Sequence, residues 1–203
     1  PLVLCLPGSR RSEIKHLAPI FGRTIAKLKA ASPQSVIVVP AAELVVAEVR
    51  GQISKWQDDV IVLDPQDHCP DQALLHKRAA FRAADVALAA SGTVSLELAA
   101  NETPMVIGYD MGWLSRQIIG RMVKTDTVTL VNLVSKTRHV PEFIGKKCSP
   151  KNLVSALLKT LESPKDQLAA MQTTMDLLGR KQDSPGERAA VSVLDFLKSE
   201  KKR

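Results

Sequence analysis

Short apolar runs alternate with longer segments of helical spacing along most of this chain, and this alternation limits its possible folds more than any other feature. The apolar runs lie at residues 2–6, 35–39, 60–63, 86–90, 105–108 and 128–130, and the segments of helical spacing lie at 12–31, 41–56, 73–84, 94–100 and 114–123. Strands that are apolar on both faces and separated by helices form a parallel sheet that helices cover on both sides. The sequence therefore predicts an α/β fold with a doubly wound parallel sheet.

The pattern changes towards the C-terminus, where the remaining sequence has helical spacing throughout. Residues 131–149 are predicted to form a loop, and the Ser-Pro-Gly breaker at 184–186 precedes a last helix. We therefore expect two parts, an α/β domain at 1–149 and a helical extension at 150–203 that packs on it.

The composition limits the classes of partner. Hydrophobic residues make up 45% of the 203 residues, enough for a substantial core, and the net charge of +7 indicates an anionic partner. Aromatic residues are only 3%, which disfavours single-stranded nucleic acid, and we expect no nucleic-acid partner. Three cysteines without a CxxC motif indicate free thiols in a reducing compartment. The chain begins at Pro1 and enters a strand at once, so we expect a fragment of a longer protein.

Two small-residue turns follow predicted strands at the edge where parallel sheets bind ligands. The first is Pro-Gly-Ser-Arg at 7–10, and the second is Ser-Gly-Thr at 91–93. Backbone N–H groups at such turns can bind phosphate, Arg10 can pair with it, and Glu97 offers a carboxylate to a ribose diol. A surface arginine at the first turn and a capped helix at the second are the alternative interpretations. Together the two turns favour a nucleotide-sugar site.

Several other kinds of site find little support. The sequence contains no GxGxxG, no P-loop, no Asp-x-Asp pair and no nucleophile elbow. The Asp, His and Cys residues at 67–76 have no familiar zinc spacing, so we interpret them as a polar loop followed by a helix. The segment 130–144 carries Asn132 and Glu142, which could line the pocket or cap a loop.

These residues together resemble the lipid-A-disaccharide synthases, glycosyltransferases built from two Rossmann-like halves in the GT-B arrangement. The matching stretches are LPGSRRSEI at 6–14, ASGTVSLE at 90–97, TPMVIGY at 103–109, RMVKTDTVTLVNLV at 121–134 and VPEFI at 140–144. The resemblance covers essentially the whole chain, but it matches only the C-terminal half of such an enzyme.

The resemblance implies an inverting transfer of 2,3-diacylglucosamine from UDP to 2,3-diacylglucosamine 1-phosphate in lipid A biosynthesis. It implies that the chain holds the donor without a metal or other cofactor, while the acceptor site and the catalytic base lie in an N-terminal half. The fragment alone is then expected to be inactive. By residue match, the donor site would contain Gly8, Ser9, Arg10, Ser91, Gly92, Thr93, Glu97, Asn132 and Glu142.

The same resemblance implies a cytoplasmic enzyme that is peripheral on the inner membrane, because both substrates carry acyl chains.

Two kinds of alternative function stay open. One is another GT-B enzyme that uses UDP-sugars, such as an epimerase or a peptidoglycan-type glycosyltransferase. The other is a non-catalytic domain for binding or assembly.

Overall fold

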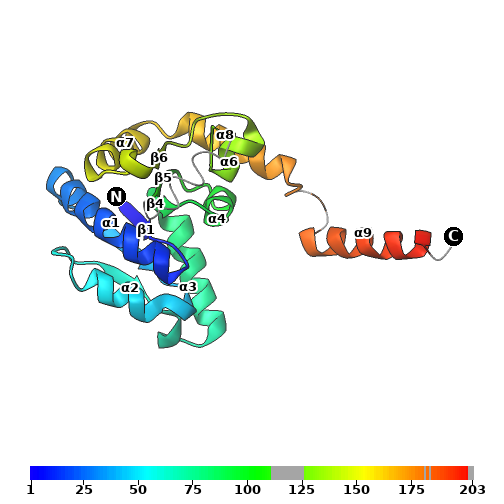
Figure 1. Cartoon of the computed structure of the whole chain (residues 1–203), viewed down its shortest axis with the longest axis horizontal. Helices are drawn as coiled ribbons and strands as arrows, with labels where there is room; N and C mark the ends of the chain where they lie inside the picture. Colours follow the sequence, from blue (N-terminus) through cyan, green and yellow to red (C-terminus); the bar gives the residue numbers. More distant parts are fainter. Residues whose placement is uncertain (111–125, 181, 183, 201–203) are drawn as a thin grey trace.

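In a computed structural model the chain forms one six-stranded parallel sheet with helices on both faces (Figure 1). The structure describes residues 1–110, 126–180, 182 and 184–200. The strands are β1 (Leu2–Leu6), β2 (Val36–Pro40), β3 (Ile61–Leu63), β4 (Val86–Ala90), β5 (Met105–Tyr109) and β6 (Glu142–Ile144). The α-helices are α1 (Arg11–Ala31), α2 (Val46–Ile53), α3 (Pro70–Ala83), α4 (Val94–Ala100), α6 (Leu130–Ser135), α7 (Pro150–Glu162), α8 (Lys165–Leu177) and α9 (Pro185–Glu200).

The strand order is β3-β2-β1-β4-β5-β6, so the chain builds outward from β1 in one direction and then from β4 in the other. In β1, Leu4 pairs with Val38 on one side and with Ala87 on the other. This order confirms the predicted doubly wound, Rossmann-like sheet. It also places the switch in winding direction between β1 and β4, because the connections that follow these two strands lead towards opposite edges of the sheet.

Alternate residues of β1, β2, β4 and β5 enter two separate cores because side chains alternate across a sheet. Val3 and Cys5 of β1 pack with α1, α2 and α7 on one face. Leu4 and Leu6 of the same strand pack with α3, α4, α6 and α8 on the other. All of these strand residues are buried, which explains the continuous apolar runs.

The sixth strand is where the prediction from sequence was wrong. Residues 128–130 do not form a strand, and the segment 131–149, expected to be a loop, contains most of α6 and all of β6. In β6, Phe143 pairs with Gly108 of β5, while Val131 of α6 is buried against the second core. A three-residue strand carries almost no periodic signal, so the position of β6 follows from its pairing with β5 and not from the local sequence.

Other differences are smaller. The expected helix at 41–56 divides into a 3₁₀ turn (Glu43–Val45) and α2, and α3 begins at Pro70 rather than at residue 73. Proline suits the first turn of a helix, where its missing N–H costs nothing. The expected helix at 114–123 lies outside the described residues.

The three C-terminal helices differ in how they pack. α7 contacts α1 and β5, and α8 contacts α4 and α6, so both help to cover the sheet. Figure 1 shows α9 extending away from the sheet, and its described side chains are exposed except for half-buried Arg188. The boundary between 1–149 and 150–203 stays a prediction.

Candidate functional site

A cavity of about 780 Å³ lies along the carboxyl edge of the sheet. The last residues of four neighbouring strands form part of its lining: Leu6 of β1, Pro40 of β2, Leu63 of β3 and Ala90 of β4. The cavity therefore includes the switch point between β1 and β4, where open α/β sheets bind ligands. Its volume lies in the range of small-molecule and cofactor sites.

The β1–α1 turn brings Gly8, Ser9 and Arg10 to the cavity, as predicted, together with Glu13. The Glu13 carboxylate lies under the turn, where Oε2 accepts a hydrogen bond from the Ser9 N–H at 3.1 Å and Oε1 pairs with Arg10 at 2.9 Å. Gly8 has φ +122°, and a Cβ there would lie 2.7 Å from Glu13. The acidic side chain thus already occupies part of the predicted anion site.

Arg10 keeps most of its donors for a ligand. Its side chain is 78% exposed, and one guanidinium nitrogen bonds Glu13. A guanidinium has five N–H donors, so pairing with Glu13 and with a phosphate can coexist. Sequence reasoning missed Glu13, although its position three residues after Arg10 places it in the first turn of α1.

The β4–α4 turn brings Ser91, Gly92 and Thr93 to the same cavity. The Ser91 hydroxyl donates to the Val128 carbonyl at 3.1 Å, and Thr93, the residue that precedes α4, makes no side-chain capping bond. Among the described hydrogen bonds, neither hydroxyl therefore caps α4, which was the alternative interpretation of this turn. Gly92 has no side chain, so it lines the cavity with its backbone.

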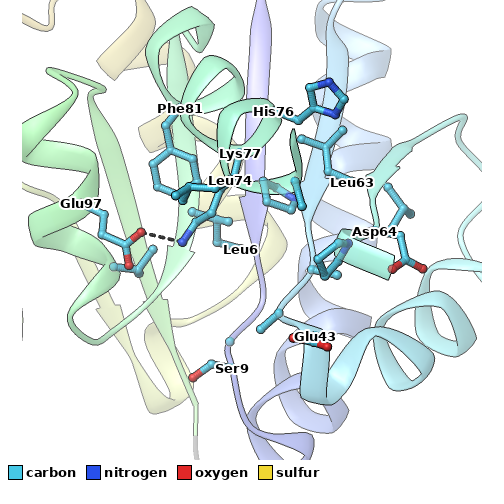
Figure 2. Close-up of a pocket in the computed structure, with 18 of the residues that line it drawn as sticks. Leu6, Ser9, Glu43, Leu63, Asp64, Leu74, His76, Lys77, Phe81 and Glu97 are labelled. Atoms are coloured by element: carbon cyan, nitrogen blue, oxygen red, sulfur yellow. Dashed lines mark hydrogen bonds and ion pairs between the residues drawn. The ribbon is translucent and has the colours of Figure 1, made fainter. Parts of the chain in front are cut away.

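Glu97 points into the cavity from α4 and pairs with Lys77 of α3 (Figure 2). Lys77 Nζ lies 2.7 Å from Glu97 Oε2 and 5.4 Å from the centroid of the Phe81 ring. The two charged side chains are 43% and 48% exposed. Sequence analysis missed Lys77; the only available signal was its position four residues before Phe81 on one helix face.

The β3–α3 loop closes the far end of the cavity. Asp64 is buried, and it accepts hydrogen bonds from the Gln66 N–H at 2.8 Å and from Arg50 Nε at 2.9 Å. The Gln66 N–H, followed by Arg50, holds the pKa of Asp64 below its ordinary value despite the cost of desolvation. The same pairing raises the pKa of Arg50. These bonds connect α2 to the loop and hold its position.

The polar segment at 67–76 forms part of this end of the cavity. His68 and His76 both line it, with ring centroids 4.4 Å apart and planes nearly perpendicular. Within the described ranges, no group of three or more His, Cys, Asp or Glu side chains is placed to hold a metal ion. The segment is a short 3₁₀ turn (Pro65–Asp67) followed by α3, as the interpretation of a polar loop before a helix predicted.

Asn132 and Glu142 are not among the residues that line the cavity. The Asn132 amide is fully buried, with both of its polar atoms bonded to the backbone of Val140. Glu142 accepts hydrogen bonds from the Thr127 hydroxyl at 2.7 Å and from the Thr129 N–H at 2.6 Å. Glu142 thus supports residues 127–129, and the Val128 carbonyl in this segment accepts the hydrogen bond of Ser91. A direct role for either residue in donor binding stays a prediction.

The sequence profile of the family described as Lipid-A-disaccharide synthetase matches residues 1–193. The chain belongs to this family. Among curated lipid-A-disaccharide synthases, that of Ruegeria pomeroyi is 51% identical over 97% of this chain and 49% of its own length. That of Rhodopseudomonas palustris is 41% identical over 98% of this chain and 49% of its own length. The chain therefore spans about half the length of the lipid-A-disaccharide synthases that it matches.

Solved structures of other enzymes share the fold of this member of the family. UDP-GlcNAc 2-epimerase from Neisseria meningitidis, bound to UDP-GlcNAc, superposes with a TM-score of 0.56 at 15% identity, over 97% of this chain and 44% of its own. The glycotransferase of kitacinnamycin gives 0.54 at 17% identity, over 96% and 42%. At such identities the likeness establishes the fold alone. No helix in the described part of the chain is long and apolar enough to span a membrane.

Proposed function

We propose that this chain is the donor-binding half of a lipid-A-disaccharide synthase, and that its cavity holds the UDP part of UDP-2,3-diacylglucosamine. The observation that carries the proposal is the meeting of three predicted groups at one cavity: the turn at 8–10, the turn at 91–93 and the Glu97 carboxylate. The membership of the family supports the choice of ligand.

In the proposed complex, the ribose diol bonds to Glu97 and the diphosphate lies between the two turns. A carboxylate accepts two hydroxyl donors at once, which suits a diol. The cavity continues past β1 to Ala41 and the β3–α3 loop, and this end offers room for the uracil base. Glu142 supports this site through residues 127–129, because the Val128 carbonyl accepts the hydrogen bond of Ser91.

We propose direct displacement with inversion at the anomeric carbon. The acceptor hydroxyl oxygen forms the new bond to that carbon, and the bond from the carbon to the diphosphate oxygen breaks, so UDP departs with the electron pair. Arg10 and the N–H groups of the turns offset the charge that develops on UDP, because fixed donors need no reorganisation during the reaction. The acceptor proton passes to a base in the other half of the enzyme. The chain alone is then inactive but competent to bind the donor.

Both substrates carry acyl chains, and the net charge of +7 favours an anionic lipid surface. We therefore propose that the complete enzyme works in the cytoplasm, at the surface of the inner membrane. Sedimentation with vesicles containing anionic lipid tests this: binding that falls with added salt supports it, and recovery of all the protein in the supernatant at low salt contradicts it.

The first test is calorimetry of UDP with the 203-residue chain. We expect saturable binding with one site. Lack of binding to the folded chain at millimolar UDP would reject the donor site.

The rival GT-B activities are tested with the complete enzyme, which should prefer the 2,3-diacylated donor. Equal turnover of UDP-N-acetylglucosamine contradicts the assignment.

Glu97→Gln should weaken UDP binding by about 1–3 kcal/mol, because it replaces charge-assisted bonds to the diol with neutral ones. The fold should be unaffected, since an exposed ion pair contributes little to stability. Glu162→Gln on α7 is the matched control, because that exposed carboxylate lies outside the cavity lining. An unchanged dissociation constant in the Glu97 variant would contradict its ribose role.

A further inference from the structure

The cavity lining carries more negative than positive side chains, although its proposed ligand is an anion. Its carboxylates are Glu13, Glu43, Asp64, Asp67 and Glu97, and its cations, leaving the histidines aside, are Arg10 and Lys77. Like charges repel strongly where protein excludes water. A diphosphate therefore needs a cation that keeps N–H donors free after its own ion pair has formed.

The carboxylates in the lining differ in how they are neutralised. Asp64 and Asp67 both pair with Arg50, and Glu13 pairs with Arg10 at the β1–α1 turn. Glu97 depends on Lys77 for its ion pair. Lys77 is thus the cation that lies beside the carboxylate proposed to hold the ribose.

Two contacts keep the Lys77 ammonium at the cavity. Nζ lies 2.7 Å from Glu97 Oε2, and it sits over the Phe81 ring, which is only 2% exposed and so forms a fixed wall (Figure 2). An ammonium has three N–H donors, and Glu97 takes one of them. Within the described part of the chain, no hydrogen bond uses the other two, which remain for a ligand.

We propose that Lys77 is a further binding residue of the nucleotide site, and that it bridges Glu97 and a phosphate oxygen of the nucleoside diphosphate. The inference rests on the proposed function. The ribose diol and the 5′-phosphate belong to one nucleotide, so a cation in contact with the diol-binding carboxylate lies close to the adjoining phosphate. The flexible stem of lysine lets the ammonium reach that phosphate while it stays near Glu97.

A double-mutant cycle separates this role from an effect that acts only through Glu97. UDP binding is measured by calorimetry at about 0.15 M ionic strength for the wild-type chain, Lys77→Met, Glu97→Gln and the double variant, at UDP concentrations that saturate the Glu97 variant. We expect Lys77→Met to weaken binding about tenfold in both backgrounds, because one charge-assisted hydrogen bond is lost. If the double variant binds UDP as tightly as Glu97→Gln alone, Lys77 acts only through Glu97 and the inference is wrong.

Two further variants exclude trivial causes. Lys165→Met removes the same charge from the exposed start of α8, outside the cavity lining, and should bind UDP like the wild type. Lys77→Arg keeps the cation and should recover most of the affinity. If Lys165→Met weakens UDP binding as much as Lys77→Met does, the effect comes from the net charge of the chain and the inference is overturned. Failure of the wild type to bind UDP would reject the donor site itself. Equal binding of UDP by the wild type and Lys77→Met would overturn only the role of Lys77.

Discussion

At the scale of single residues, Gly8 and Glu13 act as one unit. The left-handed backbone of Gly8 leaves room for the Glu13 carboxylate, which then orders Ser9 and Arg10. The motif at 7–10 was predicted to bind phosphate through free donors. The structure adds an internal carboxylate that preorganises the turn, and the exposed Arg10 side chain keeps further N–H donors; phosphate binding by this turn stays a prediction.

Gly8→Ala should destabilise the fold by about 1–3 kcal/mol, since a β-carbon at this positive φ is strained and collides with Glu13. UDP affinity should fall with it, because Arg10 loses its support. Urea unfolding and UDP titration measure the two effects.

The control is Gly51→Ala on α2, where an added Cβ meets nothing within 4 Å. There the helical preference of alanine should stabilise the chain by about 0.5–1 kcal/mol. A Gly8 variant as stable as the wild type would show that the turn adapts.

At the scale of elements, polar side chains connect segments that lie far apart in the sequence. Asp64 connects the β3–α3 loop to α2 through Arg50, and Glu142 at the start of β6 holds residues 127–129 against the second turn. Gln167 of α8 bonds both the N–H and the carbonyl of Met105 in β5. These contacts join segments far apart in the sequence, and they give the loops fixed positions without regular structure.

Asp64→Asn should lower stability at neutral pH, and the difference from wild type should disappear in acid. The pKa of Asp64 is lower in the folded chain than its ordinary value near 3.8. Its contribution is therefore fully present above that value and is lost as the pH falls through the lower, folded-state pKa.

Urea unfolding between about pH 7 and about pH 2, below the lowered folded-state pKa, measures the loss. Asp59→Asn, at an exposed position just before β3, is the control and should show no such difference. A deficit in Asp64→Asn that persists unchanged in acid would contradict the ionic role.

At the scale of the whole molecule, the cores on the two faces of the sheet contain side chains of α7 and α8 but no described side chain of α9. Leu153 and Leu157 of α7 are buried in one core, and Met171 of α8 is buried in the other. By contrast, large apolar side chains of α9 such as Phe196 and Leu197 are exposed. A contact that does tie α9 to the rest is the bond from Arg188 to the Leu178 carbonyl.

Deletion of residues 185–203 should therefore change the melting temperature by less than about 2 °C, because the deleted segment buries little apolar surface. UDP binding should stay intact. Deletion from residue 163 onward should unfold the chain, because it exposes the core that α8 covers. Thermal unfolding followed by circular dichroism compares the two. If the variant that lacks only residues 185–203 is unfolded, α9 is needed for the fold and the prediction is wrong.

Local pattern was enough for most of the secondary structure. The first five strands follow from runs that are apolar on both faces, and α4 was predicted with its observed bounds, 94–100. Hydrophobic periodicity is a property of neighbouring residues, so it can be read without knowing the partners of each element. The same holds for the two turns, whose small residues and glycines follow predicted strands directly.

The sequence by itself therefore determined the class of sheet, the edge of the sheet at which the cavity lies and the family. Only the tertiary structure decided that β6 pairs with β5, that Glu13 occupies the first turn and that Asn132 faces the interior rather than the cavity. It also brought Lys77 to Glu97, across twenty positions of the chain. Such contacts join residues whose spacing carries no periodic signal, and they form only when the packed sheet brings distant segments together.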